Sequence, residues 1–171
     1  MFKRFLALTV SVILLNVCVI AYAADGYDGG NTNADNSITD VVKWLDSSVY
    51  NIGDKYVTDV SVNTSVGAFI GNFKNHENGV MVEDAETSDI VKTGMKVKHI
   101  ISGEELIIAV AGDIDGNGQA TVTDISLIQN HINGGSKLAV DSVKFTAADI
   151  DANGRVTVVD LVNVKKYIMG E

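Results

Sequence analysis

Two acidic segments near the C-terminus contain the residues whose types and spacing indicate chemistry. Residues 112–134 read GDIDGNGQATVTDISLIQNHING and residues 148–170 read ADIDANGRVTVVDLVNVKKYIMG, with ten of 23 aligned positions identical. In each segment Asp, Asp, Asn and Asp occupy positions 1, 3, 5 and 12 of a twelve-residue loop, with Gly at position 6. EF-hand loops use this spacing to bring oxygen ligands around one Ca²⁺. One such match could be an ordinary polar turn, but two copies offset by 36 residues predict two calcium sites.

We expect each loop to hold one calcium ion. Side chains at positions 1, 3, 5 and 12 ligate, position 7 contributes its backbone carbonyl, and position 9 ligates directly or through water. The expected ligands are Asp113, Asp115, Asn117, Gln119, Thr121 and Asp124 in the first loop, and Asp149, Asp151, Asn153, Arg155, Thr157 and Asp160 in the second. Six Asp carboxylates in two short loops repel one another without a cation, so we expect poor order in the absence of calcium.

Both loops depart from an ordinary EF-hand. Position 12 is Asp instead of the longer Glu, and residues 106–112 before the first loop resemble a strand. Each repeat is therefore expected to be a loop followed by an exiting helix, with the two helices packed antiparallel. The predicted inner faces, with apolar residues three or four apart, are Val122, Ile125, Ile128 and Ile132 in the first helix and Val158, Leu161, Val164 and Ile168 in the second.

These repeats resemble the type I dockerin domain, whose signature is a duplicated loop–helix calcium motif of about this length. The resemblance covers residues 111–171. It implies docking onto a cohesin domain, usually on a cellulosome scaffold, by which bacteria gather proteins that degrade plant polysaccharides. Dockerins of this type recognise their partner through loop positions 10 and 11 and helix positions 17 and 18. In this sequence these are Val122, Thr123, Gln129 and Asn130 in the first repeat and Val158, Val159, Lys165 and Lys166 in the second.

The two partner-reading faces differ from the best-known dockerin pattern, in which both repeats carry a Ser-Thr and a Lys-Arg pair. Here the first face reads Val-Thr and Gln-Asn, whereas the second reads Val-Val and Lys-Lys. Because these faces differ in charge, we expect one dominant binding orientation rather than two interchangeable ones. Val158 also lies on the predicted inner stripe of its helix, so a core role remains an alternative for this residue.

Composition excludes some classes of partner. The chain has 171 residues, and 22 acidic against 13 basic residues give a net charge of -9. Nucleic-acid binding depends on a surplus of Lys and Arg, so nucleic acid is not expected as a partner. The same charge argues against anionic membranes.

The N-terminus predicts export. Residues 1–24 combine two basic residues, an apolar run over 5–20 and an Ala-Tyr-Ala exit, which is typical of a signal peptide. A retained membrane anchor is the alternative. The single cysteine, Cys18, lies in this segment, so the exported protein would rely on a core or a bound ion instead of disulfides. We expect a secreted, extracellular protein, at a cellulosome or cell surface, without stable membrane insertion after cleavage.

The rest of the chain divides into a linker and a small module. Residues 25–37, rich in Asp, Gly and Asn, are expected to be a flexible linker. Residues 38–111 are expected to form a β-rich α+β module with a helix over 38–49 and a second, capped helix after Thr64-Ser65. Its expected strands are Tyr56–Val62, Val80–Val82, Met95–Ile101 and Glu105–Ala111.

This module offers no recognisable catalytic set. Its acidic residues at 83–89 and 104–105 are expected to be solvated loop charges, and His76 and His99 surface or partly packed residues. Trp44, Tyr50 and Tyr56 are expected to pack in a core or an interface. The stretch 56–113 is similar to small β-rich modules that precede dockerins in other secreted proteins, a group with no known activity. Its close junction with the first loop suggests that the two domains pack together.

The predicted fold class is therefore α+β: a small β-rich module (38–111) followed by an all-α dockerin (112–171) with two EF-hand-like loop–helix calcium repeats. We expect a calcium-binding docking protein that is not an enzyme. Since dockerins commonly accompany O-glycosyl hydrolases, a carbohydrate-active component is the first alternative. A calcium-stabilised cell-surface protein without a cohesin partner is the second.

Overall fold

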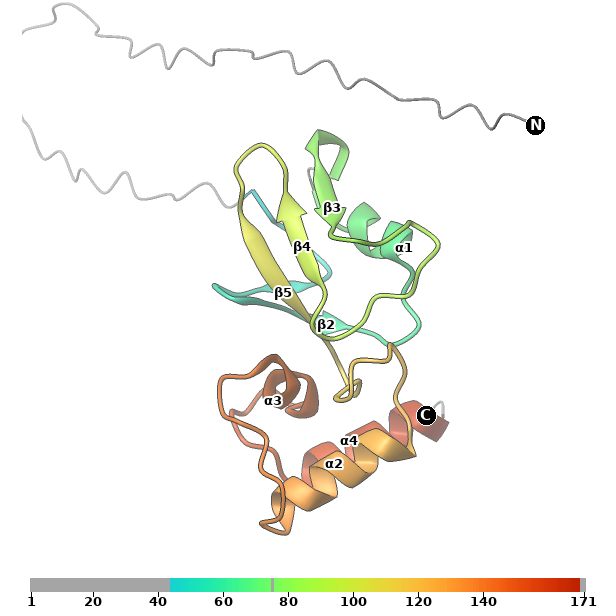
Figure 1. Cartoon of the computed structure of the whole chain (residues 1–171), viewed down its shortest axis with the longest axis vertical. Coiled ribbons are helices and arrows are strands. Elements are labelled where there is room, and N and C mark those ends of the chain that lie inside the picture. The colour runs from blue at the N-terminus through green and yellow to red at the C-terminus, as the bar shows by residue number, and fades with distance from the viewer. Residues whose placement is uncertain (1–43, 75, 170–171) are drawn as a thin grey trace, which may run out of the picture. The chain divides into compact units, whose positions relative to one another are not determined.

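The computed structural model describes residues 44–74 and 76–169, which belong to a single unit (Figure 1). The predicted signal peptide, the linker and the beginning of the predicted helix at 38–49 lie outside the described residues. Within the part of the chain that is described, no helix is both long enough and apolar enough to cross a membrane.

Five strands form one sheet in the order β1-β2-β5-β4-β3. Their bounds are β1 Asn51–Ile52, β2 Tyr56–Val60, β3 Val80–Val82, β4 Lys96–His99 and β5 Glu105–Val110. The pair β2–β5 is parallel and the other pairs are antiparallel. A parallel pair requires a long connection, and here it is supplied by helix α1 (Val66–Gly71), a 3₁₀ turn (His76–Asn78) and the strands β3 and β4.

The first apolar core lies between this sheet and α1. Val57 of β2 and Ile108 of β5 are fully buried, as is Phe69 of α1. The predicted cap is confirmed, because the Ser65 side chain accepts a hydrogen bond from the Ala68 N–H. Strand β3 has the predicted bounds, and the other three predicted strands are present but end earlier.

The predicted helix over 38–49 is wrong in its described part. Residues 44–50 form bends with one isolated bridge between Ser47 and Phe73. The Ser47 Oγ accepts hydrogen bonds from the N–H groups of Val49 and Tyr50, at 3.1 and 3.2 Å. Such local side chain–backbone bonds compete with helix formation, which apolar periodicity alone does not reveal.

Three helices follow the sheet: α2 (Val122–Ile132), α3 (Val143–Ala148) and α4 (Val158–Met169). Helices α2 and α4 lie side by side and run in opposite directions, as predicted (Figure 1). They enclose a second apolar core in which Ile114, Ile128 and Val164 are fully buried. Strands followed by helices confirm the predicted α+β class.

Two expectations for the repeats are corrected. The second loop does have an entering helix, because α3 ends at Ala148, directly before Asp149. This helix has only six residues, too few for a periodic signal, although Ser142 caps it. Val122, Val158 and Ile168 do not lie in the core as predicted, since they are 72%, 59% and 38% exposed. Val122 and Val158 are the first residues of their helices, and Ile168 lies in the last turn of α4.

The sheet and the helices are in direct contact. Helix α3 packs against β5 and β2. The Gly112 N–H donates to the Ala147 carbonyl at 3.0 Å. The Tyr56 hydroxyl donates to the Asp141 carbonyl. Tyr56 therefore packs at an interface, as expected.

Candidate metal centre

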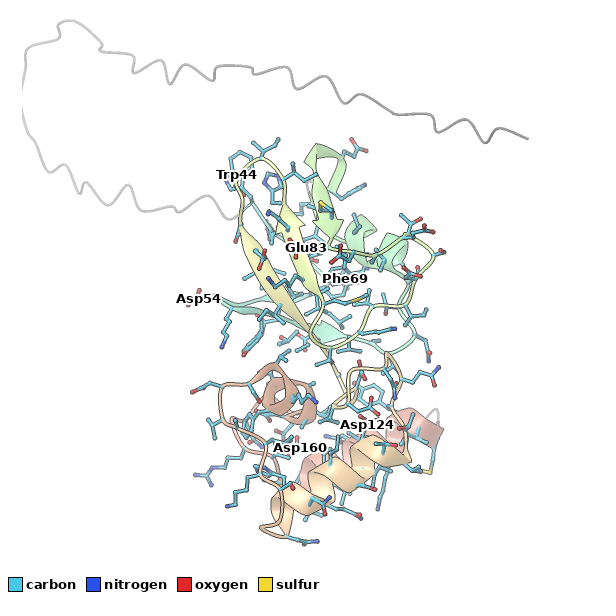
Figure 2. All side chains as sticks on the ribbon, in the orientation of Figure 1. Trp44, Asp54, Phe69, Glu83, Asp124 and Asp160 are labelled. Carbon is cyan, nitrogen blue, oxygen red and sulfur yellow. The ribbon has the colours of Figure 1, made fainter. Side chains whose placement is uncertain are left out.

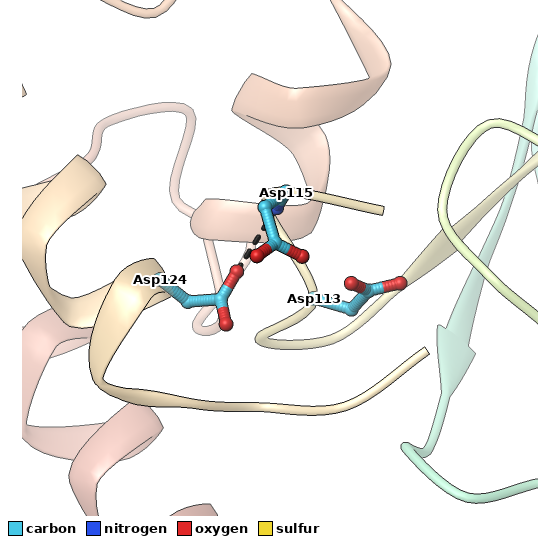
Figure 3. Close-up of side chains that lie close together, drawn as sticks. All are labelled: Asp113, Asp115 and Asp124. Atoms are coloured by element: carbon cyan, nitrogen blue, oxygen red, sulfur yellow. Dashed lines mark hydrogen bonds between the residues drawn. The ribbon is translucent and has the colours of Figure 1, made fainter. Parts of the chain in front are cut away.

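Three carboxylates converge in each acidic loop. Asp113, Asp115 and Asp124 each place one oxygen within 4.8 Å of the others. Figure 3 shows them gathered where the loop turns back to the beginning of α2. The second loop repeats this arrangement with its own three Asp residues, Asp149, Asp151 and Asp160. The spacing of positions 1, 3 and 12 thus brings the predicted carboxylates together in both repeats.

The Asp at position 12 joins the two ends of each loop. Asp124 Oδ1 accepts hydrogen bonds from the N–H groups of Ile114 and Asp115, at 2.8 and 2.9 Å. Its Oδ2 accepts from the N–H and the hydroxyl of Thr121, at 2.8 and 2.9 Å. Thr121 is also the N-cap of α2, forming a capping box with Asp124. The loop and the exiting helix therefore share one set of polar contacts.

The second loop has the same closure. Asp160 Oδ1 accepts from the N–H groups of Ile150 and Asp151, at 2.9 and 3.3 Å. Its Oδ2 accepts from the N–H of Thr157 at 2.8 Å and from its hydroxyl at 3.2 Å. The shorter Asp side chain at position 12, instead of Glu, is thus placed to bridge the loop ends in both repeats.

Positions 1, 3 and 5 curl the loop through side chain–backbone hydrogen bonds. The Asn117 N–H donates to one carboxylate oxygen of Asp113 at 2.8 Å and of Asp115 at 3.0 Å. The Gln119 N–H donates to the Asn117 side-chain oxygen at 2.8 Å. The matching bonds in the second loop join Asn153 to Asp149 and Asp151, and Arg155 to Asn153. Gln119 and Arg155 at position 7 are exposed, which suits a position that ligates through its backbone.

Burial of these carboxylates is energetically costly when no basic side chain pairs with them. Asp113, Asp124 and Asp160 are fully buried. Among the described residues, no salt bridge joins Lys or Arg to any of the six loop carboxylates. Partial burial raises the pKa of Asp149 above its usual value, and the nearby Asp160 raises this pKa further. Hydrogen bonds from the N–H groups of Gly154 and Asn153 have the opposite effect and lower it. A set of hard oxygen donors with uncompensated negative charge fits Ca²⁺.

One family model matches the C-terminal part of the chain. Residues 111–169 match the family model of the dockerin type I domain. The match begins directly after β5, and it contains both carboxylate clusters and the helices α2, α3 and α4. At family level, dockerins bind calcium and dock onto cohesins. Searches of the curated proteins and of the solved structures found no match.

The predicted partner-reading residues lie on the surface of the segment that matches the dockerin model. In the first repeat Val122, Thr123, Gln129 and Asn130 are all exposed, and in the second repeat so are Val158, Val159, Lys165 and Lys166. The exposure of Val158 removes the alternative of a core role. Whether these residues contact a cohesin stays a prediction.

The β-rich module contains structural contacts that the sequence did not reveal. Glu104, expected to be a solvated charge, accepts hydrogen bonds from the N–H groups of Trp44 and Leu45, both at 3.0 Å. His99 is fully buried, not at the surface. Figure 2 shows Trp44 near one end of the sheet and Asp124 and Asp160 among the helices beyond the other end. One module residue contacts an expected calcium ligand directly, because the Thr93 N–H donates to Asp113 Oδ2 at 2.8 Å.

Proposed function

We propose that this chain is a secreted docking protein whose dockerin segment binds two calcium ions and then a cohesin. The observation that supports it most strongly is the duplicated cluster of three Asp carboxylates within the segment that matches the dockerin family. Calcium would neutralise these carboxylates and order the loops that begin α2 and α4. The twelve ligand positions are those predicted from the loop spacing.

The exposed faces of α2 and α4 are the proposed cohesin-binding surfaces, and they are chemically different. The α2 face comprises six positions on the helix and its C-cap: Val122, Thr123, Ser126, Gln129, Asn130 and Asn133. The equivalent positions of the α4 face are Val158, Val159, Val162, Lys165, Lys166 and Met169. The α4 face is apolar with two cations, and the α2 face is mostly polar and uncharged. All six α4 residues are exposed.

This difference supports a single dominant orientation in which the α4 face binds. Valine and methionine side chains gain free energy when a partner covers them, whereas uncharged polar side chains must exchange hydrogen bonds with water. The two lysines favour a partner with carboxylates around an apolar patch. The expected cohesin surface is therefore apolar at its centre and acidic at its edge.

The docking proposal also implies a role for the module of β1 to β5. We propose that the module is delivered to an extracellular scaffold of the cellulosome type, where polysaccharide is degraded, and that it has no catalytic role. The carboxylates of Glu83, Glu104 and Glu105 support this view, because they are in contact with Lys98, with backbone N–H groups and with Lys96, respectively. A carbohydrate-active component and a calcium-stabilised surface protein are the other outcomes to be tested.

The deciding experiment measures binding of the chain from residue 25 onward to a panel of cohesins. Binding in millimolar calcium that is lost with a chelator is the expected result. Charge reversal of Lys165 and Lys166 should weaken binding far more than Gln129→Glu with Asn130→Glu. Calcium-ordered protein that binds no cohesin would favour the surface-protein function. Turnover of plant polysaccharide would show an enzyme.

A further inference from the structure

The two calcium loops have equivalent sequences but different surroundings. In the first loop Asp113 and Gly118 are buried and Asp115 is half-buried. At the same positions of the second loop, Asp149 is half-buried and both Asp151 and Gly154 are exposed. The β-rich module that contains β1 to β5, or sheet module, causes the difference, because its segment 89–95 lies against the first loop.

Thr93 connects this segment to the ligand at position 1. Its N–H donates to Asp113 Oδ2 at 2.8 Å, and its hydroxyl accepts from the Val110 N–H at 3.0 Å. The neighbouring Gly94 N–H donates to the Ile108 carbonyl at 2.9 Å. Val91 is fully buried in the core of the module, and its N–H donates to the Thr64 carbonyl at 2.9 Å. The donor to Asp113 is therefore held by the sheet and its core.

The glycines of the first loop have the module directly beside them. A Cβ on Gly116 would lie 3.0 Å from the Thr93 carbonyl oxygen, and one on Gly118 would lie 3.1 Å from side-chain carbons of Ile90 and Lys92. In the second loop the residue equivalent to Gly116 is Ala152, which has a positive φ of 54°. At Gly154, equivalent to Gly118, a Cβ would meet nothing within 4 Å.

We propose that the sheet module is a structural part of the first calcium site, with Thr93 as a positioning residue for Asp113. The module holds the first loop in its binding conformation, so that this loop binds calcium more tightly than the second. Coupling between two sites is reciprocal, and calcium in the first loop therefore stabilises the sheet module. This inference rests on the proposed calcium binding.

The first experiment uses Trp44, the single tryptophan of the chain, to follow unfolding of the module. Trp44 lies near the end of the sheet away from the calcium loops (Figure 2), where its ring stacks on that of the module residue His99. Saturating calcium should raise the melting temperature of the Trp44 fluorescence signal in the full chain by roughly 5 °C or more. Asp115→Ala should abolish most of this rise. Asp151→Ala, the same change in the second loop, should leave most of it.

These variants form a matched pair because neither removes a contact with the module. Asp115 accepts hydrogen bonds from Asn117 within its own loop, and Asp151 accepts from Asn153. Calorimetric titration of the two variants then gives the affinity of each remaining site. We expect the first site, measured in Asp151→Ala, to bind calcium about ten-fold or more tightly than the second, because the hydrogen bond from the Thr93 N–H fixes the carboxylate of Asp113.

A second pair keeps the inference testable if the Asp variants fold poorly. Gly118→Ala and Gly154→Ala both strain a positive φ, at 89° and 81°, but only the first also meets the module. Gly118→Ala should lower the melting temperature of the Trp44 signal, and Gly154→Ala should change it much less. Equal shifts within either pair, or equal calcium affinities, would overturn the inference while leaving calcium binding intact. Absence of calcium binding at both loops would overturn the proposed function as well.

Discussion

The indole ring of Trp44 stacks on the imidazole of His99, with ring centroids 5.0 Å apart and an angle of 18° between the planes. His99 is fully buried, and its Nδ1 accepts a hydrogen bond from the Ser102 N–H at 3.2 Å. Its Nε2 has no hydrogen-bond partner among the described residues. Trp44 is 40% exposed and packs against this ring, so its emission depends on an intact module.

Glu104 is predicted to hold Trp44 in this position. Its Oε2 accepts from the N–H groups of Trp44 and of the fully buried Leu45. Glu104→Ala should destabilise the module by about 1–3 kcal/mol and shift Trp44 emission to longer wavelength, because two N–H groups lose a charged acceptor. Urea unfolding followed by tryptophan fluorescence measures both effects.

Glu83 supplies the control for this prediction. It forms an ion pair with Lys98 at 4.0 Å, and both side chains are more than a third exposed. Glu83→Ala should cost less than about 1 kcal/mol and leave the emission unchanged. A loss as large as that of Glu104→Ala would mean that charge, not the Trp44 segment, determines the stability of the module.

Removal of calcium is predicted to unfold the helical part. Asp113, Asp124 and Asp160 are fully buried, and a bound cation would balance their negative charge. Addition of a chelator should reduce the helical circular dichroism signal, and calcium should restore it. Magnesium at the same concentration should restore less, because it prefers strict octahedral geometry and keeps its water ligands. A helical signal that does not respond to chelator would contradict this expectation.

Much of the metal site could be predicted from the sequence because its chemistry is local. The carboxylates that converge in one loop, such as Asp113 and Asp124, are separated by ten intervening residues, and the loop repeats. The position of Thr93 could not be predicted in this way. It contacts Asp113 from 20 residues earlier through a backbone N–H, which every non-proline residue has. A contact of this type depends on sheet topology, and the residue types in the sequence do not indicate it.

The errors at the helices also have physical causes. A periodic apolar pattern predicted a helix over 38–49, but the Ser47 side chain and Glu104 bind the backbone of residues 44–50 instead. Val122 and Val158 fit the apolar period of their helices and are nevertheless exposed. Periodicity identifies a face but not where along the helix its contact with a neighbour begins.

The core between α2 and α4 is predicted to be sensitive to truncation. Ile128 is fully buried among the helices, so Ile128→Ala should destabilise the helical segment by about 2–5 kcal/mol. Val122→Ala on the same helix is the control, because Val122 is 72% exposed, and it should change stability by less than about 0.5 kcal/mol. Thermal unfolding followed by circular dichroism in calcium measures both. Similar losses would show that α2 does not pack through Ile128.

The α4 face is predicted to contribute most of the free energy of cohesin binding. A substitution of Val162 tests this prediction without changing a lysine. Val162 is 45% exposed, and Ser126 is exposed at the equivalent position of α2. Val162→Asp places a charge in the apolar stripe and should weaken cohesin binding about ten-fold or more, whereas Ser126→Asp should have little effect. Calorimetric titration with a cohesin measures both, and unchanged circular dichroism in calcium confirms that the variants fold. If Ser126→Asp weakens binding more than Val162→Asp, the α2 face is the one that docks and the proposed orientation is reversed.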